Sequence, residues 1–198
     1  RRRYAGNPEA NFFFGSDQPA LDRMDLVREV PSVSDPQTLA LAEQLHPDVV
    51  CVFGTSLIRG PLLERFTLMN LHGGLSPEYR GADCTYWALY NGEPEKVGCT
   101  LHYIDPGIDT GKLIAHVCPE VHTGDDELVL FWRAVMDSAE VYAEAIARFV
   151  AGGLPGIAQE EKGKLYRVKD RTWASEREMA RRNNQMTPLK LGRRVVWF

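Results

Sequence analysis

The chain has 198 residues, of which 44% are hydrophobic and 25% are charged, and its formal net charge at pH 7 is -4. This length and composition suit a single globular unit with a full core and exclude a chain that is disordered throughout. An acidic chain has no broad attraction to a phosphate backbone or an anionic membrane, so we expect neither nucleic acid nor membrane as a partner.

The first half of the chain alternates between helical and strand-like segments. Residues 1–15 predict no clear element, whereas Asp35 and Pro36 supply a cap and a first helical residue for a helix that ends near His46. Residues 48–53 form a short, β-branched apolar run, which is typical of a strand buried on both faces in a parallel sheet.

A short helix over 59–65 and a strand over 67–70 follow. Because helices and strands alternate, we predict an α/β fold with a doubly wound, mostly parallel sheet. In such sheets ligands bind outside the carboxyl ends of the strands, where residues 54–57 and 70–74 would lie.

Further along, the pattern predicts a helix over 82–90, strands over 97–104 and 112–117, and a long helix over 125–150 that begins near Thr123 or Gly124. Apolar residues of the long helix recur at spacings of three and four, which predicts a face that packs in the core. They are Leu128, Phe131, Val135, Ala139, Tyr142, Ile146 and Phe149.

We expect residues 1–153 to form the main domain and residues 154–198 a C-terminal appendage. In the appendage, residues 163–168 predict a short hairpin and residues 172–184 predict a helix. The charge run Lys164, Arg167, Lys169 and Arg171 is expected to be a solvated face. The apolar ending, residues 195–198, would be awkward in water, so we expect it to pack on the main domain or on a second subunit. A homodimer is the expected assembly.

The four cysteines, at positions 51, 84, 99 and 118, form no CxxC pair and no cluster with histidines, so no metal site is expected. Cys51 and Cys99 lie in apolar strand-like runs, which favours buried free thiols over disulfides. Because the sequence also lacks a signal peptide and an apolar run of ~20 residues, we expect a cytoplasmic protein.

Side chains suited to chemistry on a carbonyl group lie between Asn70 and Asp109. Asn70 and His72 are two residues apart, so in an extended segment they point to the same side. Such a pair can be purely structural, but the backbone-permissive residues beside it favour close approach of a ligand. These residues are Gly73, Gly74, Pro77 and Gly81.

Three motifs, Asn70–Gly81 (NLHGGLSPEYRG), Gly98–His102 (GCTLH) and Ile108–Gly111 (IDTG), together resemble the signature of the folate-dependent formyltransferases. That superfamily includes glycinamide ribonucleotide transformylase, methionyl-tRNA formyltransferase and the sugar N-formyltransferases. The resemblance runs from about Asp48 to Ile114. It implies a Rossmann-like fold and transfer of a formyl group from 10-formyltetrahydrofolate, as co-substrate, to a primary amine.

By this resemblance Asn70, His72 and Asp109 match the catalytic residues. Attack of an amine on a formyl carbon creates an oxyanion and a protonated nitrogen, so the site needs a hydrogen-bond donor and a proton acceptor. Asn70 can donate to the oxyanion, and His72 with Asp109 can take up or relay the proton. On composition alone Asp105 competes with Asp109, but the Asp-Thr-Gly context favours Asp109.

The resemblance also implies supporting and cofactor-binding positions. His102 would support the loop that carries the carboxylate, with Thr100 on the same face two residues earlier. The pterin would contact mainly the backbone of two loops, whose residues here are Gly54, Thr55, Ser56, Leu57, Ile58, Ile104, Asp105, Gly107 and Ile108. Tyr79 and Arg80 either bind an acidic acceptor or brace the loop after Pro77.

Two departures from the family pattern concern the acceptor. Many members have a serine where this chain has Gly74, which removes a hydroxyl and predicts a wider loop. No segment before Ser34 supplies the family's opening strand and glycine-rich turn, so that strand is either missing or divergent.

The acceptor is expected to be a small-molecule amine. Transfer-RNA formylation relies on a separate C-terminal barrel domain, and glycinamide ribonucleotide would need a phosphate-holding turn near the N-terminus. A nucleotide-linked amino sugar is therefore the best prediction, with glycinamide ribonucleotide or another small amine as the alternative. A formyltetrahydrofolate hydrolase and a folate-binding scaffold protein are two further alternatives.

Overall fold

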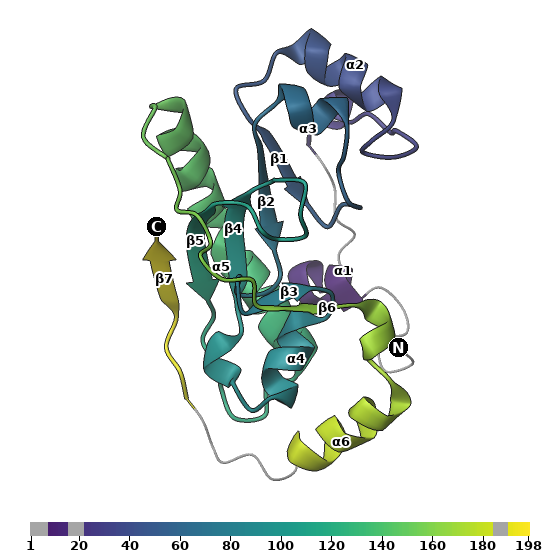
Figure 1. The fold of residues 1–198 in the computed structure, drawn as a ribbon. Helices are drawn as coiled ribbons and strands as arrows, with labels where there is room; N and C mark the ends of the chain where they lie inside the picture. Colours follow the sequence, from purple (N-terminus) through teal and green to yellow (C-terminus); the bar gives the residue numbers. More distant parts are fainter. Residues whose placement is uncertain (1–7, 16–21, 184–189) are drawn as a thin grey trace.

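The computed structural model describes residues 8–15, 22–183 and 190–198. A five-stranded sheet in the order β1-β2-β4-β5-β7 forms its centre (Figure 1). The strands are β1 (Val50–Phe53), β2 (Leu68–His72), β4 (Cys99–Tyr103), β5 (Leu113–Cys118) and β7 (Arg194–Trp197). In the described part of the chain no helix is long and apolar enough to cross a membrane.

The α/β class is confirmed, but the prediction of a mostly parallel sheet is wrong. Only β1 and β2 pair in parallel in this sheet, whereas β4 is antiparallel to both β2 and β5, and β7 is antiparallel to β5. The short loop over 104–112 explains part of this difference, because it is too short for the crossover that parallel neighbours require.

The predicted helices form with small shifts at their ends. The helices are α1 (Pro8–Phe14), α2 (Pro36–Leu45), α3 (Pro61–Arg65), α4 (Cys84–Tyr90), α5 (Glu127–Val150) and α6 (Trp173–Asn183), with single 3-10 turns η2 (Met24–Leu26), η3 (Pro94–Lys96) and η4 (Val168–Asp170). The helix α1 was not predicted, and residues 1–7 and 16–21 of the opening segment lie outside the described residues.

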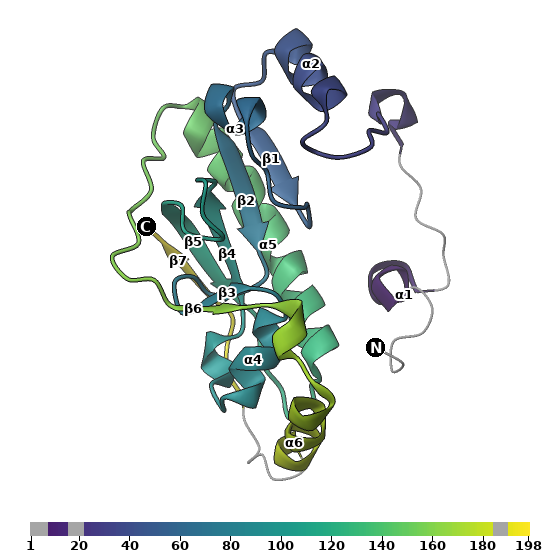
Figure 2. The ribbon, with the colours of Figure 1, turned by 45° about the vertical axis from the view of Figure 1, so that its right-hand side comes forward.

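The long helix α5 runs along one face of the sheet (Figure 2). It begins after Asp126, whose carboxylate accepts hydrogen bonds from the N–H groups of Leu128 and Val129, and so starts later than predicted. Its buried stripe is also rotated from the predicted one, because small side chains let the helix approach the sheet closely. These buried residues are Leu130, Ala134, Ser138, Val141 and Ala145.

Strand β1 lies at the edge of the described sheet. Val52 is buried against Ile58 and Leu68, but Cys51 is exposed and Phe53 is 42% exposed. The prediction that this strand is buried on both faces is therefore wrong, as is the prediction of a buried thiol at Cys51. An apolar run predicts a strand but does not determine whether other elements cover both of its faces.

Residues after Gly153 pair with strands that precede it. The strand β6 (Lys164–Tyr166) pairs in parallel with β3 (Tyr79–Gly81), so the predicted hairpin over 163–168 does not form. The apolar ending forms β7 and is covered by the main sheet and α5, since Val195 and Trp197 pack against the core that contains Val141.

Candidate active site

A cleft of about 1010 Å³ opens where β1 and β2 end. Phe53 to Ile58 and Asn70 to Gly73 line it at the carboxyl ends of these two parallel strands, as the sequence predicts. All nine predicted cofactor-binding residues line this cleft, and so do Asn70, His72, His102 and Asp109. The fold thus brings together two loops and three motifs that lie far apart in the sequence.

His72 at the end of β2 is 7% exposed, and one of its ring nitrogens is hydrogen-bonded to the backbone. Its Nε2 lies 2.9 Å from the carbonyl oxygen of Tyr79, which can only accept, so Nε2 carries the hydrogen. In the neutral ring Nδ1 is then unprotonated, and it lies 3.5 Å from Oδ2 of Asp109. Burial lowers the pKa of His72, against the opposing effect of Asp109, so the ring is neutral near pH 7.

His102 on β4 presents a nitrogen of the same kind from the neighbouring strand. Its Nδ1–H donates to the carbonyl oxygen of Tyr103 at 2.7 Å, so Nε2 is unprotonated in the neutral ring. Nε2 lies 3.1 Å from Nδ2 of Asn70, which donates to it, and 3.6 Å from Oδ1 of Asp109. One N–H of the Asn70 amide is therefore engaged with His102, and the other is available to a ligand in the cleft.

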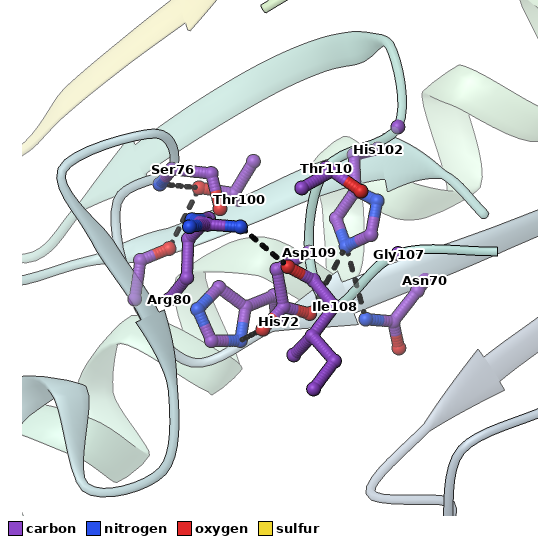
Figure 3. Close-up of polar contacts among 12 residues, drawn as sticks. Asn70, His72, Ser76, Arg80, Thr100, His102, Gly107, Ile108, Asp109 and Thr110 are labelled. Atoms are coloured by element: carbon purple, nitrogen blue, oxygen red, sulfur yellow. Dashed lines mark hydrogen bonds and ion pairs between the residues drawn. The ribbon is translucent and has the colours of Figure 1, made fainter. Parts of the chain in front are cut away.

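Asp109 lies between the two imidazoles, and its backbone adopts the left-handed region with φ 53° (Figure 3). Its Oδ2 accepts a hydrogen bond from the N–H of Gly81 at 2.8 Å. Burial raises the pKa of Asp109, but the two histidines and the Gly81 N–H outweigh it together, and the net pKa lies below its ordinary value. The carboxylate is therefore ionised at neutral pH.

This arrangement can accept one proton. An unprotonated imidazole nitrogen faces each carboxylate oxygen at a distance longer than an ordinary hydrogen bond. A proton that arrives at Nδ1 of His72 would form a charge-assisted hydrogen bond to Asp109. A proton acceptor and an amide N–H donor, Asn70, therefore occupy the same wall of the cleft.

Comparison with known proteins identifies the family. The family model described as Formyl transferase matches residues 16–146, which is more than half of the chain. The chain belongs to the formyl transferase family.

Individual formyltransferases show how far the similarity extends. The methionyl-tRNA formyltransferase of Geobacter metallireducens is 32% identical over 138 residues, which are 68% of this chain and 44% of that protein. The formyltransferase PseJ from Anoxybacillus kamchatkensis superposes with a TM-score of 0.55 at 30% identity, over 62% of this chain and 66% of that one. A sugar N-formyltransferase from Shewanella gives a TM-score of 0.62 at 20% identity, covering 75% and 65% of the two chains, and this likeness concerns the fold alone.

The chain spans less than half the length of the curated relatives it matches. Structural neighbours span the acceptor classes of the family, because sugar N-formyltransferases and a glycinamide ribonucleotide transformylase are both among them. The comparisons therefore identify the family, whose members transfer formyl groups, and do not identify an acceptor.

Gly74 does not open extra space in the loop, contrary to the prediction of a wider loop. A Cβ atom at Gly74 would lie 2.5 Å from Cβ of Cys84, 2.7 Å from Nε2 of His72 and 2.8 Å from the carbonyl oxygen of Tyr79. Because three parts of the site pack against this position, glycine here permits close approach within the protein rather than extra space for an acceptor.

Thr100 does not line the cleft but holds the loop behind His72. Its hydroxyl donates to the carbonyl oxygen of Gly74 at 2.6 Å and accepts from the N–H of Ser76 at 2.9 Å (Figure 3). The side chain is fully buried. Thr100 thus supports the loop that follows His72, whereas His102 supports Asp109 and Asn70.

Two residues whose roles the sequence left open belong to the loop framework. Arg80 is 8% exposed and donates to the carbonyl oxygens of Ile108 and Gly163 at 3.1 and 2.8 Å, so it braces the loop. Asp105 accepts hydrogen bonds from the Gly107 N–H and the Thr110 hydroxyl, which makes it part of a turn on the cleft wall. The structure places Asp109, not Asp105, between the histidines.

Sequence reasoning missed residues that come to the site from distant segments. Gln159 donates to two backbone carbonyls of the Asp109 loop, and Arg171 lines the cleft within an ion cluster that includes Glu127 at 2.8 Å. The expectation of a solvated charge run is wrong for Arg171, whose side chain is 19% exposed. No local signal marks these two residues, because their contacts are made with segments distant in sequence.

Proposed function

We propose that this formyltransferase transfers a formyl group from 10-formyltetrahydrofolate to the primary amine of a nucleotide-linked amino sugar. The observation that carries the proposal is the grouping of Asn70, His72 and Asp109 on the wall of one cleft, with a proton acceptor beside an amide donor. Membership of the formyl transferase family supports the same chemistry.

The half of the cleft near β1 suits a folate. Phe53, Leu57 and Ile108 line it and are 40 to 42% exposed, so they offer apolar faces that flat aromatic rings can cover. The loops over 54–58 and 104–109 supply backbone polar groups beside them. When bound here, 10-formyltetrahydrofolate would supply the formyl group.

The residues of this chain then have separate tasks. The free N–H of Asn70 donates to the formyl oxygen as negative charge develops on it, a contribution typically worth ~3 kcal/mol. His72 takes up the proton that the acceptor nitrogen loses, and Asp109 stabilises the resulting imidazolium. As the bond between the formyl carbon and the donor nitrogen breaks, His72 would return this proton to that nitrogen, so that tetrahydrofolate leaves as a neutral amine. His102 keeps Asn70 and Asp109 in place through its contacts with both side chains.

The other half of the cleft would bind the acceptor. Its lining comes from the end of β3 and the start of α4, from the first turns of α5 and from the segment around β6, and consists of residues 81–86, Glu127, Leu128, Phe131, Trp132, residues 165–168 and Arg171. Arg171 is engaged there by three carboxylates, whereas Arg167 has no ion pair with any residue in the described ranges. An exposed cation and aromatic side chains in one cavity suit the phosphate and base of a nucleotide.

A related structure supports this class of acceptor. PseJ, at 30% identity, was solved in complex with UDP-4,6-dideoxy-4-formamido-L-AltNAc and tetrahydrofolate, a formylated nucleotide-linked amino sugar with the folate product. By analogy the two halves of the cleft in this chain would hold the nucleotide sugar and the folate side by side.

The test is incubation of the protein with 10-formyltetrahydrofolate and a panel of UDP- and dTDP-linked amino sugars, with glycinamide ribonucleotide in parallel. We expect tetrahydrofolate and an N-formyl sugar to form together with at least one nucleotide sugar. Tetrahydrofolate released without any amine would indicate a hydrolase, and transfer to glycinamide ribonucleotide alone would overturn the proposed acceptor.

Variants separate the chemistry from binding. Asn70→Ala should lower kcat by about 100-fold or more, as loss of one oxyanion donor does, and His72→Ala and Asp109→Asn should lower it further. The matched controls Asp48→Asn and His122→Ala change residues away from the cleft and should leave turnover unchanged. Near-normal turnover of His72→Ala would contradict its role as proton acceptor.

A further inference from the structure

The turn that carries Asp109 is held by a side chain from a distant segment. Nε2 of Gln159 lies 3.0 Å from the carbonyl oxygen of Asp109 and 2.7 Å from that of Gly111. A side-chain amide has two N–H groups, so Gln159 uses both of them on the two ends of one turn. Gln159 lies beyond residues 16–146, the part of the chain that matches the family model.

The orientation of this amide is determined by its donors. Its Oε1 is buried and has no hydrogen-bond partner among the described residues. If the amide were flipped, so that Oε1 and Nε2 exchanged places, Oε1 would face the two carbonyl oxygens and be repelled by them. The amide therefore leaves its own acceptor without a partner while both of its donors hold the turn.

The turn needs such support, because its backbone is unusual. Asp109 has φ 53°, a left-handed conformation that an L-residue adopts only where its surroundings determine it. At Gly111 a Cβ atom would lie 1.8 Å from the carbonyl oxygen of Tyr103, so the chain leaves the turn pressed against β4. Arg80 holds the preceding peptide through the carbonyl oxygen of Ile108 (Figure 3).

The backbone of this turn determines where the Asp109 carboxylate points. Its Oδ2 reaches the N–H of Gly81 at 2.8 Å, and its two oxygens lie 3.5 and 3.6 Å from His72 and His102. Because one carboxylate makes all three contacts, any movement of the turn would change them together. The hydrogen bonds from Gln159 to the carbonyl oxygens of Asp109 and Gly111, which we call the Gln159 clamp, therefore control the position of the Asp109 carboxylate.

We propose that Gln159 is a positioning residue that holds Asp109 in its catalytic orientation through the carbonyl oxygens of Asp109 and Gly111. The kinetic consequence rests on the proposed function, whereas the geometric consequence does not. Gln159 does not line the cleft. Its effect on the reaction passes entirely through the Asp109 turn.

Two variants test the clamp. Gln159→Met keeps the length of the side chain without donors, and Gln159→Glu keeps its shape but places a carboxylate against the two carbonyl oxygens. We expect each to lower kcat by about 100-fold, the cost of displacing a catalytic group by about 1 Å, with much smaller changes in either KM. Gln44→Met, at a glutamine of α2 remote from the cleft, should have no effect.

The alternative results overturn the proposal. A kcat within about twofold of wild type for both variants, or a loss confined to KM, would show that the turn holds its shape without Gln159. A loss of activity in both variants that accompanies a general fall in Tm, rather than a folded protein with low kcat, would show a merely structural role.

A titration of Asp109 gives a readout that needs no substrate. Carbon-13 NMR of the full chain, with Asp109→Asn for assignment, would follow the carboxyl group against pH in wild type and in Gln159→Met. We expect its pKa to rise in the variant, because the carboxylate moves away from the groups that now favour its charged form. The titratable and charged groups that face it are His72 on β2, Arg80 on β3, Cys84 on α4 and His102 on β4.

This titration separates the two proposals. If wild type forms no N-formyl product with any amine, the proposed function fails, and the NMR shift still decides the role of Gln159. If transfer occurs but the pKa of Asp109 is the same in wild type and Gln159→Met, the positioning role fails and the proposed function stands.

Discussion

The backbone N–H of Gly81 donates a hydrogen bond of 2.8 Å to the carboxylate of Asp109. This contact joins the last residue of the Asn70–Gly81 motif to the Ile108–Gly111 motif and so couples the β3 segment to the proton acceptor. Gly81 can make it only as glycine, because its φ is +89° and a Cβ atom would lie 2.2 Å from the carbonyl oxygen of Tyr166.

Gly81→Ala should therefore destabilise the protein and lower its activity. The left-handed conformation alone costs an L-residue roughly 1–2 kcal/mol, and the collision with a backbone atom adds to it. Chemical denaturation and turnover are the measurements. Gly124→Ala is the matched control, since Gly124 has φ +91° and an added methyl group would have no atom within 4 Å, so this variant isolates the strain. Equal effects of the two variants would contradict the collision.

Glycine 74 provides a second test of packing behind the site. Gly74→Ala would bring Cβ within 2.8 Å of Cys84, His72 and Tyr79, so the imidazole must move. We expect a loss of stability of about 1–3 kcal/mol, as for other overpacked sites, together with a fall in kcat. Gly153→Ala, whose nearest contact would be 3.9 Å away, should be tolerated. Wild-type turnover in Gly74→Ala would show that the loop can relax.

Thr100→Val should affect stability more than chemistry. The change keeps the shape of the side chain but leaves the Gly74 carbonyl and the Ser76 N–H without their buried partner. We expect a loss of about 1–3 kcal/mol in the free energy of unfolding, measured by urea denaturation. Thr123→Val, at an exposed position, should change it little. A large fall in kcat with an unchanged free energy of unfolding would argue for a direct role of Thr100 at the cleft.

The lowered pKa of His72 predicts how stability depends on pH. As pH falls through 6.5, the unfolded chain protonates this histidine while the buried ring stays neutral, so the folded state loses stability. His72→Asn removes this pH-dependent loss of stability. Between about pH 7 and pH 5 the Tm of the variant should therefore fall less than the Tm of wild type. His116, whose pKa is also lowered by burial, contributes equally to both proteins. His122→Asn, at an exposed position, should keep the wild-type slope.

The ion cluster around Arg171 predicts a loss of stability that becomes smaller as pH falls. Arg171→Met would leave Glu127 buried without its cation, and we expect a loss of about 3 kcal/mol near pH 8. Burial already raises the pKa of Glu127, and loss of Arg171 raises it further. The folded variant then binds a proton more readily than the unfolded chain, so the loss should be smaller near pH 5. Lys169→Met is the exposed control, and a pH-independent loss would contradict this account.

The sequence by itself determined the chemistry-bearing positions and most elements. Asn70, His72 and Asp109 stand in local motifs, and a spacing of two in a strand is enough to put Asn70 and His72 on one side. Caps and the spacing of apolar residues predicted α2 and α5, which are also local features. These features depend on residues within a few positions of each other, where the period of the backbone determines which side chains share a face.

Only the tertiary structure decided how the elements pair and what supports the site. An apolar run predicts a strand but does not show which strands it pairs with or in which direction. The antiparallel orientation of β4 and the edge position of β1 are therefore determined by long-range pairing. The contacts of Gln159 with the Asp109 turn and the packing of Gly74 against Cys84 likewise join segments that are distant in sequence or on different elements. Such contacts depend on the summed packing of the whole chain, which no local pattern contains.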